Sequence, residues 1–417
     1  MESLKHNAIS AGKYFRTFYR WVLVSVGTGL VCGVVGSAFH LTVDYVTNVR
    51  AGAPWLIFFL PLGGLAIAFI YSVSRMVGEG TNGIIDSIHD GGRVRMRLVP
   101  LIFISTAITH LVGGSAGREG AALQIGGGIG YRVGSLLKLD DKDMRLVTLC
   151  GMSAVFAALF GTPLTATLFA LEVISVGVLY YSGLIPCLVA SVTAYGVSRL
   201  AGIEPMRYAV MLEPLEVGLI VRVCILAVAC AVVSMVFCIA MHKTEEFAAK
   251  KLKNIYLRAF IGGVIVIALT VLVGSESYNG TGTDVISAAL CDGKAPTWGF
   301  LWKIVFTAVS IGFGFKGGEI VPTMFIGATL GCMLGPLLGI PAQFAAAIAL
   351  VAVFCGAVNC PIASIILSVE LFGSGELVYF ALACGISYML SGYFGLYSSQ
   401  KIMYSKTRAE YINRYAE

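Results

Sequence analysis

Two ionisable residues stand side by side in an apolar part of the chain, in the stretch GREGAALQIG from position 117 to 126. Arg118 and Glu119 are the only charges in this stretch. A carboxyl group in such surroundings is protonated, paired or in contact with water and ions, because an isolated charge there is costly. We expect Glu119 to carry a proton and to alternate with an anion at a helix start, while Arg118 shapes an entrance. The alternative is a buried ion pair between Arg118 and a carboxylate.

A second carboxyl group, Glu319, lies in the stretch GGEIVP and immediately precedes another apolar segment. If it faces the same pathway, it supplies a second proton-carrying group. If it is charged, it repels anions, so we expect it to be protonated or hydrogen-bonded when an anion is near. The alternative is a helix-capping carboxylate without a role in transport. A coupled pair of Glu119 and Glu319 would titrate jointly.

Four glycine-rich segments precede apolar runs and predict helix starts with unpaired backbone N–H groups. Such amides, with the helix dipole, bind anions without any fixed positive charge. The alternative is that the glycines only permit close helix packing. The segments are 80–85, with Asn82, Gly83 and Ile84; 117–120, ending in Gly120; 317–322, with Ile320 and Val321; and 280–284.

The composition predicts the class of protein that positions these residues. Of 417 residues, 57% are hydrophobic and 12% are charged, against about 25% charged in soluble domains. Stretches without Asp, Glu, Lys or Arg are long enough to cross a bilayer as helices; they run from 21 to 43, 55 to 74, 98 to 117, 146 to 171, 173 to 198, 223 to 241 and 377 to 400. A longer one, 320 to 369, is interrupted by four prolines and predicts several helices in series. We therefore predict an all-α polytopic membrane protein.

The chain contains two related halves. The segment 117–126 can be aligned with 318–327, and 163–173, PLTATLFALEV, with 361–371, PIASIILSVEL. The matched segments occur in the same order in both halves, and their offsets, 201 and 198 residues, are nearly equal. This predicts a tail at 1–20, a first transmembrane repeat at 21–205 and a second at 206–417. Repeats of this kind, often inverted in the membrane, place a substrate site at their interface.

Basic residues predict the orientation. They gather before position 21, at 75–97, at 243–258 and after 400, and the positive-inside rule places these segments and both termini in the cytoplasm. The tail is amphipathic and is expected to be retained rather than cleaved as a signal peptide. The net charge of +6 does not imply a nucleic-acid partner, because a basic rim beside the lipid bilayer explains it. The eleven cysteines lie mostly in apolar runs without metal spacing, so we expect packing and no disulfides.

Taken together, these residues resemble the CLC family of chloride channels and anion/proton antiporters. The motifs occur in the family's order: GTNGII for its first anion-binding loop, GREGA for its glutamate motif, GGEIVP for its second-half loop, and Tyr397 in GLYSSQ for its inner tyrosine. The resemblance implies an inverted-repeat bundle of about 18 helices, many not fully spanning. It also implies a homodimer in which each subunit has its own pathway.

The departures from the chloride members point to the bacterial fluoride/proton antiporter branch. Asn82 replaces a serine, Glu319 replaces an apolar residue, Ala121 replaces a proline, and Val173 stands where chloride antiporters have an inner proton-relaying glutamate. Fluoride is small and tightly hydrated, so its site needs close, strong donors. The amide of Asn82 and the hydroxyl of Tyr397 can supply them; the alternative for both is a satisfied polar group in the core.

The resemblance implies export of fluoride ion in exchange for inward protons, across a bacterial inner membrane. Hydrogen fluoride enters cells as a neutral acid and dissociates in a less acidic cytoplasm, so this exchange confers fluoride resistance. The alternatives are a chloride/proton antiporter and a passive anion channel. An intramembrane serine hydrolase is a further alternative, since GGSAG at 113–117 matches G-x-S-x-G with His110 nearby. We expect no enzyme, cofactor, metal or nucleic-acid partner, since no Walker loop, zinc motif or haem signature is present and the five histidines are scattered.

Overall fold

The computed structural model describes residues 2–211 and 213–417, with side chains from residue 12 onward. It is built almost entirely of helices. In the first half these are α1 (Glu2–Gly52), α2 (Leu60–Val73), α3 (Thr81–Asp90), α4 (Leu98–Leu111), α5 (Glu119–Leu136), α6 (Asp141–Phe160), α7 (Pro163–Glu172) and α8 (Leu184–Leu200), with short helical segments η1 (Pro54–Phe59) and η2 (Tyr181–Gly183). In the second they are α9 (Val217–Lys251), α10 (Ile255–Val273), α11 (Thr283–Ser287), η3 (Ala288–Asp292), α12 (Gly299–Gly312), α13 (Ile320–Leu337), α14 (Ala342–Val358), α15 (Pro361–Phe372) and α16 (Leu377–Leu390).

The helices confirm a polytopic membrane protein and correct several predicted spans. Among the described residues, seven helical segments are long and apolar enough to cross a membrane: 12–52, 54–73, 141–160, 181–200, 217–251, 255–273 and 320–337. The predicted span at 98–117 is wrong, because α4 ends at Leu111 and a glycine-rich loop follows. Likewise, α16 covers only the first part of 377–400. Loops inside these apolar stretches are possible because they are buried in protein rather than exposed to lipid.

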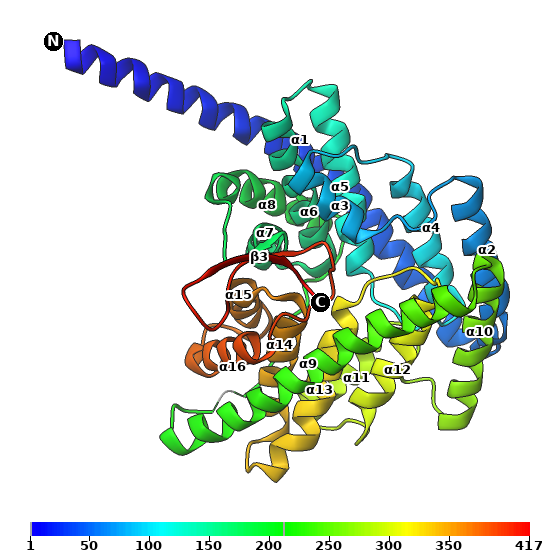
Figure 1. Ribbon diagram of the computed structural model, residues 1–417. Coiled ribbons are helices and arrows are strands. Elements are labelled where there is room, and N and C mark those ends of the chain that lie inside the picture. Colours follow the sequence, from blue (N-terminus) through cyan, green and yellow to red (C-terminus); the bar gives the residue numbers. More distant parts are fainter. Residues whose placement is uncertain (1, 212) are drawn as a thin grey trace.

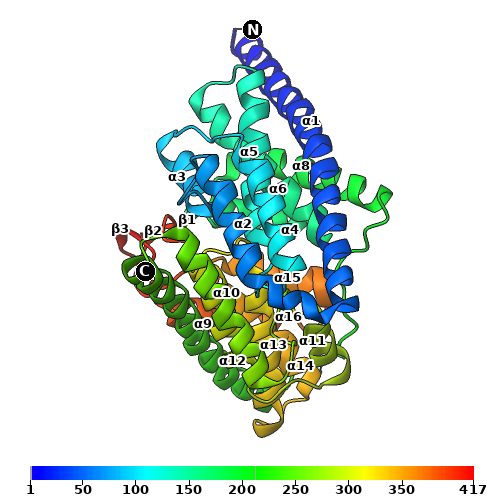
Figure 2. The same cartoon turned by 90° about the vertical axis from the view of Figure 1, so that its right-hand side faces the viewer.

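The two halves lie on opposite sides of the molecule and repeat each other's helix bounds. Helices α1–α8, blue to green, form one side, and α9–α16, green to red, form the other (Figures 1 and 2). Both α4 and α5 recur 201 residues later as α12 and α13, with identical lengths. Residues 2–20 of the predicted tail form the first part of α1. Residue 1 lies outside the described residues. The tail and repeat boundaries stay predictions.

Glycine pairs set the spacing of the central helices in both halves. Gly126 and Gly130 on α5 correspond to Gly327 and Gly331 on α13. A Cβ atom at Gly130 would lie 3.0 Å from the Cα atom of Thr148 on α6, and one at Gly331 would lie 2.7 Å from the Cα atom of Ala346 on α14. Small residues four positions apart allow helix backbones to approach this closely. The packing interpretation of the glycines therefore applies here, inside α5 and α13.

Two glutamates related by the repeat hold the halves together. The carboxylate of Glu172, at the end of α7, accepts hydrogen bonds from the backbone N–H groups of Ile362 and Ala363, at 3.1 and 2.8 Å. Glu370 on α15 accepts from Leu164 and Thr165 in the same way, at 3.0 and 2.8 Å. Each carboxylate satisfies the orphan amides that begin a helix of the other half.

A small sheet that the sequence did not predict follows the last helix. Strand β2 (Lys401–Tyr404) pairs in parallel with β1 (Ser175–Val176) and antiparallel with β3 (Tyr411–Tyr415). It ties the end of the chain to the end of the α7 segment. All eleven cysteines are free, as expected, and nine of them are buried.

Candidate functional site

The glycine-rich loops before α5 and α13 meet at the centre of the molecule. Gly117 and Gly318 exchange two backbone hydrogen bonds, 2.6 Å from the Gly117 nitrogen and 2.7 Å from the Gly318 nitrogen, in an antiparallel bridge. These positions correspond in the two repeats. The bridge therefore brings the carboxyl groups of Glu119 and Glu319 to one interface between the halves.

Glu119 is fully buried at the start of α5. Its Oε2 atom accepts a hydrogen bond from the backbone N–H of Val321, at 3.2 Å, in the first turn of α13. Its Oε1 atom has no hydrogen-bond partner among the described residues. The amide donor shown here belongs to the other half of the chain. The carboxylate thus occupies the helix start at which the sequence analysis placed an anion.

The close approach of the loops requires glycine at position 120. A Cβ atom there would lie 3.1 Å from the Cα atom of Gly318 and 3.2 Å from the Oε2 atom of Glu319. A side chain would separate the two loops or displace the second carboxyl group. Gly120 therefore contributes space, and its place next to Glu119 is a steric condition of the site.

A cavity of about 220 Å³, here called the Glu319 cavity, brings together three predicted site residues from distant parts of the chain: Asn82, Glu319 and Tyr397. The Oε2 atom of Glu319 and the hydroxyl of Tyr397 are buried and have no hydrogen-bond partner among the described residues. Buried polar atoms are normally paired, so unpaired ones indicate a place for water or an ion. The cavity is large enough for several water molecules.

Asn82 is already engaged with the loop that carries Tyr397. Its Nδ2 atom donates to the hydroxyl of Ser398 at 3.0 Å, and the backbone N–H of Ser399 donates to its Oδ1 atom at 3.3 Å. One of its two N–H groups is thus used by the protein, and the other remains for a ligand. Gly83 and Ile84 follow Asn82 in the first turn of α3.

The apolar members of the predicted site contribute backbone only. The side chains of Ile84, Ile320 and Val321 are buried. The amides at the starts of α3 and α13 are therefore what these residues can offer an anion. The start of α3 opens to the Glu319 cavity through Gly80, Thr81 and Asn82.

Arg118 lines a second cavity, of about 510 Å³, here called the Arg118 cavity. Its Nη1 atom lies 2.6 Å from the Oδ1 atom of Asp44 on α1, and the Oδ2 atom of Asp44 lies 2.8 Å from the Nε2 atom of His40. The structure therefore pairs Arg118 with a carboxylate, but this carboxylate is half-exposed, whereas the alternative considered from the sequence was a buried ion pair. Because the paired arginine also lines the cavity, ion pairing and a place at an entrance are compatible.

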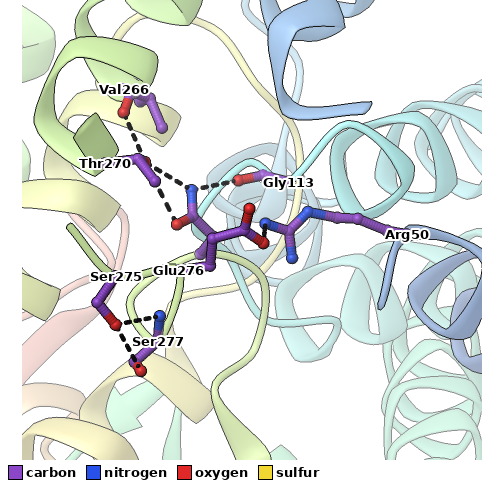
Figure 3. Close-up of polar contacts among 8 residues, drawn as sticks. Arg50, Gly113, Val266, Thr270, Ser275, Glu276 and Ser277 are labelled. Atoms are coloured by element: carbon purple, nitrogen blue, oxygen red, sulfur yellow. Dashed lines mark hydrogen bonds and ion pairs between the residues drawn. The ribbon is translucent and has the colours of Figure 1, made fainter. Parts of the chain in front are cut away.

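The loop between α10 and α11 forms the opposite wall of the Arg118 cavity. Arg50 contacts Glu276 at 2.8 Å (Figure 3). The amide nitrogen of Asn279 donates to the carbonyl of Gly113 at 2.9 Å. The fully buried Lys303 donates to the carbonyls of Tyr278 and Gly280, at 3.1 and 2.8 Å. The glycine-rich segment 280–284 lines this cavity and is not in the lining of the Glu319 cavity. The four predicted helix starts therefore do not all converge on one point.

The two cavities lie at opposite ends of a membrane-spanning helix. Arg258, in the first turn of α10, lines the Glu319 cavity, whereas Glu276, shortly after the end of α10, lines the Arg118 cavity. A helix of 19 residues is about 28 Å long. Glu119 is in the lining of neither cavity, whereas its neighbour Arg118 lines one of them and Glu319 lines the other.

Two polar residues near the site were missed from the sequence. The Nε2 atom of Gln124 donates to the hydroxyl of Thr81 at 3.1 Å, and that hydroxyl lies 3.4 Å from the carbonyl oxygen of Gly120. Both residues line the Glu319 cavity. A signal was present, since Gln124 is the only uncharged polar side chain in GREGAALQIG.

The residues of the hydrolase alternative are used elsewhere. The Ser115 hydroxyl is hydrogen-bonded to that of Thr307 at 3.0 Å, whereas the Nδ1 atom of His110 lies 2.8 Å from the carbonyl oxygen of Thr106. A serine nucleophile needs a base within hydrogen-bonding reach. Within the described part of the chain, no group of three or more His, Cys, Asp or Glu side chains is arranged to hold a metal ion.

Comparisons with known proteins agree with this geometry. Residues 63–392 match the family model described as voltage gated chloride channel. A "Chloride/fluoride channel protein" of Pseudomonas syringae pv. tomato is 37% identical over 396 residues, covering 93% of this chain and 87% of the relative. A solved structure described as a CLC-type fluoride/proton antiporter superposes with a TM-score of 0.88 at 31% identity, covering 92% of this chain and 98% of that one. A slow cyanobacterial Cl⁻/H⁺ antiporter shares the fold, with a TM-score of 0.76 at 19% identity, over 89% of this chain and 94% of that one. The chain therefore belongs to the CLC family of anion/proton antiporters and channels.

Proposed function

We propose that this chain is a fluoride/proton antiporter that exports fluoride and takes up protons, and thereby confers fluoride resistance. The observation that carries the proposal is the hydrogen bond from the Val321 amide to the Glu119 carboxylate. A buried carboxylate that occupies a helix start blocks an anion from the same amides. When it is protonated it loses the charge that holds it there, and an anion can take its place.

Three features of the Glu319 cavity support fluoride as the anion. The Tyr397 hydroxyl and the second N–H group of Asn82 are short-range donors, which suit a small, strongly hydrated ion. Glu319 supplies a second carboxyl group beside the first, where it can take over the proton. The names of the relative and of the solved structure at 31% identity also mention fluoride.

By the positive-inside rule, the basic segments on the side of the Glu319 cavity support a cytoplasmic position for that cavity. The Arg118 cavity then faces the outside. Since one chain contains both cavities, we infer one pathway per chain, also within a homodimer in a bacterial inner membrane.

Flux measurements in proteoliposomes test this function. Vesicles containing the purified protein are loaded with fluoride, and a fluoride electrode and a pH-sensitive dye follow both ions. We expect fluoride leaving down its gradient to drive protons into the vesicles against theirs. A chloride/proton antiporter would do this with chloride instead. A passive channel would release the anion without proton movement, which would refute the proposal.

A further inference from the structure

The Glu319 cavity contains charged side chains that the exchange of Glu119 and an anion does not use. They come from four segments around it: Glu79 from the loop before α3, His242 and Glu245 from α9, Arg258 from α10 and Lys316 from the loop before α13. Tyr397, 2% exposed, has an unpartnered hydroxyl, and one oxygen of Glu319 is also unpartnered among the described residues. These buried, unsatisfied atoms indicate that the cavity holds water or an ion.

A proton that reaches Glu319 needs an exchange partner at the mouth of this cavity. Two candidates in the cavity lining are occupied, and a further carboxylate, Glu172, which is outside the lining, is also committed. Glu79 lies 3.8 Å from the guanidinium of Arg95, and His242 lies 2.8 Å from the carbonyl of Gly395 through its Nε2 atom. Glu172, the carboxylate nearest in sequence to the missing relay at Val173, is committed to the start of α15 through both its oxygens.

Glu245 is the remaining carboxyl group of the cavity lining. It is exposed, and its side chain has no hydrogen bond or ion pair with the described residues. Its neighbour Glu246, by contrast, contacts Lys243 and Lys250, at 3.4 and 2.7 Å, and is not in the lining. Helix α9 holds Glu245 at the end of α12: a Cβ atom at Gly312 would lie 3.0 Å from the Glu245 backbone nitrogen.

We propose that Glu245 is the solvent-side proton exchanger of Glu319, joined to it through water in the Glu319 cavity. The inference rests on the proposed antiport. A protonated Glu319 releases its proton to a chain of water molecules, which deliver it to the Glu245 carboxylate. Glu245 then releases the proton to the solvent. Glu319 is left charged and able to accept the next proton from Glu119, and no electrons or further reactants are involved.

The basic side chains of the cavity make this transfer possible without repelling the anion. Three carboxylates in one cavity would exclude fluoride, but Lys316 and Arg258 face the same space. The ammonium of Lys316 lies 4.7 Å from the centre of the Tyr71 ring, which fixes it on the α2 side. Glu245, Lys316 and Glu319 line this one cavity. A negative charge can therefore move between the carboxylates next to a fixed positive one.

The test compares Glu245→Gln with the matched neighbour variant Glu246→Gln in the proteoliposome assay. Glutamine keeps the size of the side chain and cannot exchange a proton. We expect coupled proton uptake to fall about 10²-fold in Glu245→Gln, the lower end of the range for a removed proton-transfer group. Fluoride binding, measured by isothermal titration calorimetry in detergent, is expected to stay at the wild-type level, as is the whole behaviour of Glu246→Gln. Glu245→Asp is expected to restore most of the flux.

Each result bears on the proposal. If the wild type couples the two ions and Glu245→Gln couples them equally well, the relay is overturned and the antiport remains intact. An equal loss in Glu246→Gln would also overturn it, because surface charge alone would then explain the effect. Wild-type protein that moves fluoride without protons would refute the antiport itself.

Discussion

The carboxylate of Glu119 in one half of the chain accepts a hydrogen bond from the backbone amide of Val321 in the other, at 3.2 Å. This contact joins the two repeats at the point where their glycine-rich loops pair. It also brings a carboxyl group to the start of α13, where backbone amides lack partners within the helix. The contact therefore makes the two halves of the chain one site, and neither half contains the site alone.

Replacing Glu119 by Gln is expected to abolish proton coupling without unfolding the protein. The amide oxygen of glutamine can still accept from the Val321 N–H, so the packing is retained, but the side chain can no longer gain or lose a proton. We expect proton uptake to fall by about 10²-fold or more. Paired measurements of fluoride and proton flux check this, and intact stoichiometric exchange would contradict the assignment of Glu119.

Glu172→Ala is the matched control for that variant, since Glu172 is also a buried intramembrane glutamate bonded to backbone amides of the other half. Its role is to cap α15. We expect the opposite pattern, with a loss of about 1–2 kcal/mol in stability, as for other helix caps, and an unchanged ratio of fluoride to protons. Thermal unfolding in detergent measures the first quantity and vesicle flux the second.

Gly120→Ala is expected to impair both stability and transport. The new methyl group would press on the Cα atom of Gly318 and on the Glu319 carboxyl group, 3.1 and 3.2 Å away. Overpacking of this kind costs about 1–3 kcal/mol. Gly196→Ala on α8, with no atom within 4 Å, is the control and is expected to be neutral or to stabilise by about 0.5–1 kcal/mol. Equal unfolding temperatures for the two variants would refute the steric argument.

The sequence predicted the parts of this site that depend on local patterns and on the repeat. The stretches around Glu119 and Glu319 could be aligned because both repeats keep the glycines that their close contact requires. The contacts between distant segments could not be predicted. Nothing local to Asn82 indicates that its amide meets Ser398, 316 residues away.

The wrong span at 98–117 has a physical cause. An apolar stretch predicts burial, and in a bundle this thick a buried segment can be a loop as well as a helix. That is why the stretch at 98–117 contains both α4 and a loop. The segment 280–284 does lead into a helix, α11, but it lines the Arg118 cavity rather than the Glu319 cavity. The small sheet was missed because β1 has only two residues, too few for a pattern.

Asn82→Ser is expected to weaken fluoride binding selectively. A hydroxyl donates one hydrogen bond where the amide donates two, and Ser398 already takes one of these. The loss of one hydrogen bond of about 1 kcal/mol corresponds to a roughly fivefold higher Kd for fluoride. Calorimetric titration with fluoride and chloride measures it, with Asn48→Ser in the Arg118 cavity as the control. Fluoride binding that is unchanged in Asn82→Ser would remove this residue from the anion site.

Lys406 lies in the hairpin between β2 and β3, outside the membrane-spanning helices. Its ammonium donates to the hydroxyl of Ser391 at 3.0 Å and lies 4.6 Å from the centre of the Tyr388 ring. Burial lowers the pKa of Lys406 from 10.5 to about 8. Between these values the unfolded chain binds a proton that the folded protein has lost, so the free energy of unfolding rises with pH.

Comparison with Lys406→Met isolates this contribution from the other groups that titrate at high pH. We expect the stability of the wild type, relative to the variant, to be constant below about pH 8 and to rise by up to about 2–3 kcal/mol as the pH approaches 10.5. Thermal unfolding of both proteins in detergent from pH 7 to 10.5 measures the difference. A difference that stays flat or falls across this range would mean that the Lys406 ammonium keeps its proton in the folded state, held by Ser391 and the Tyr388 ring strongly enough to offset its burial.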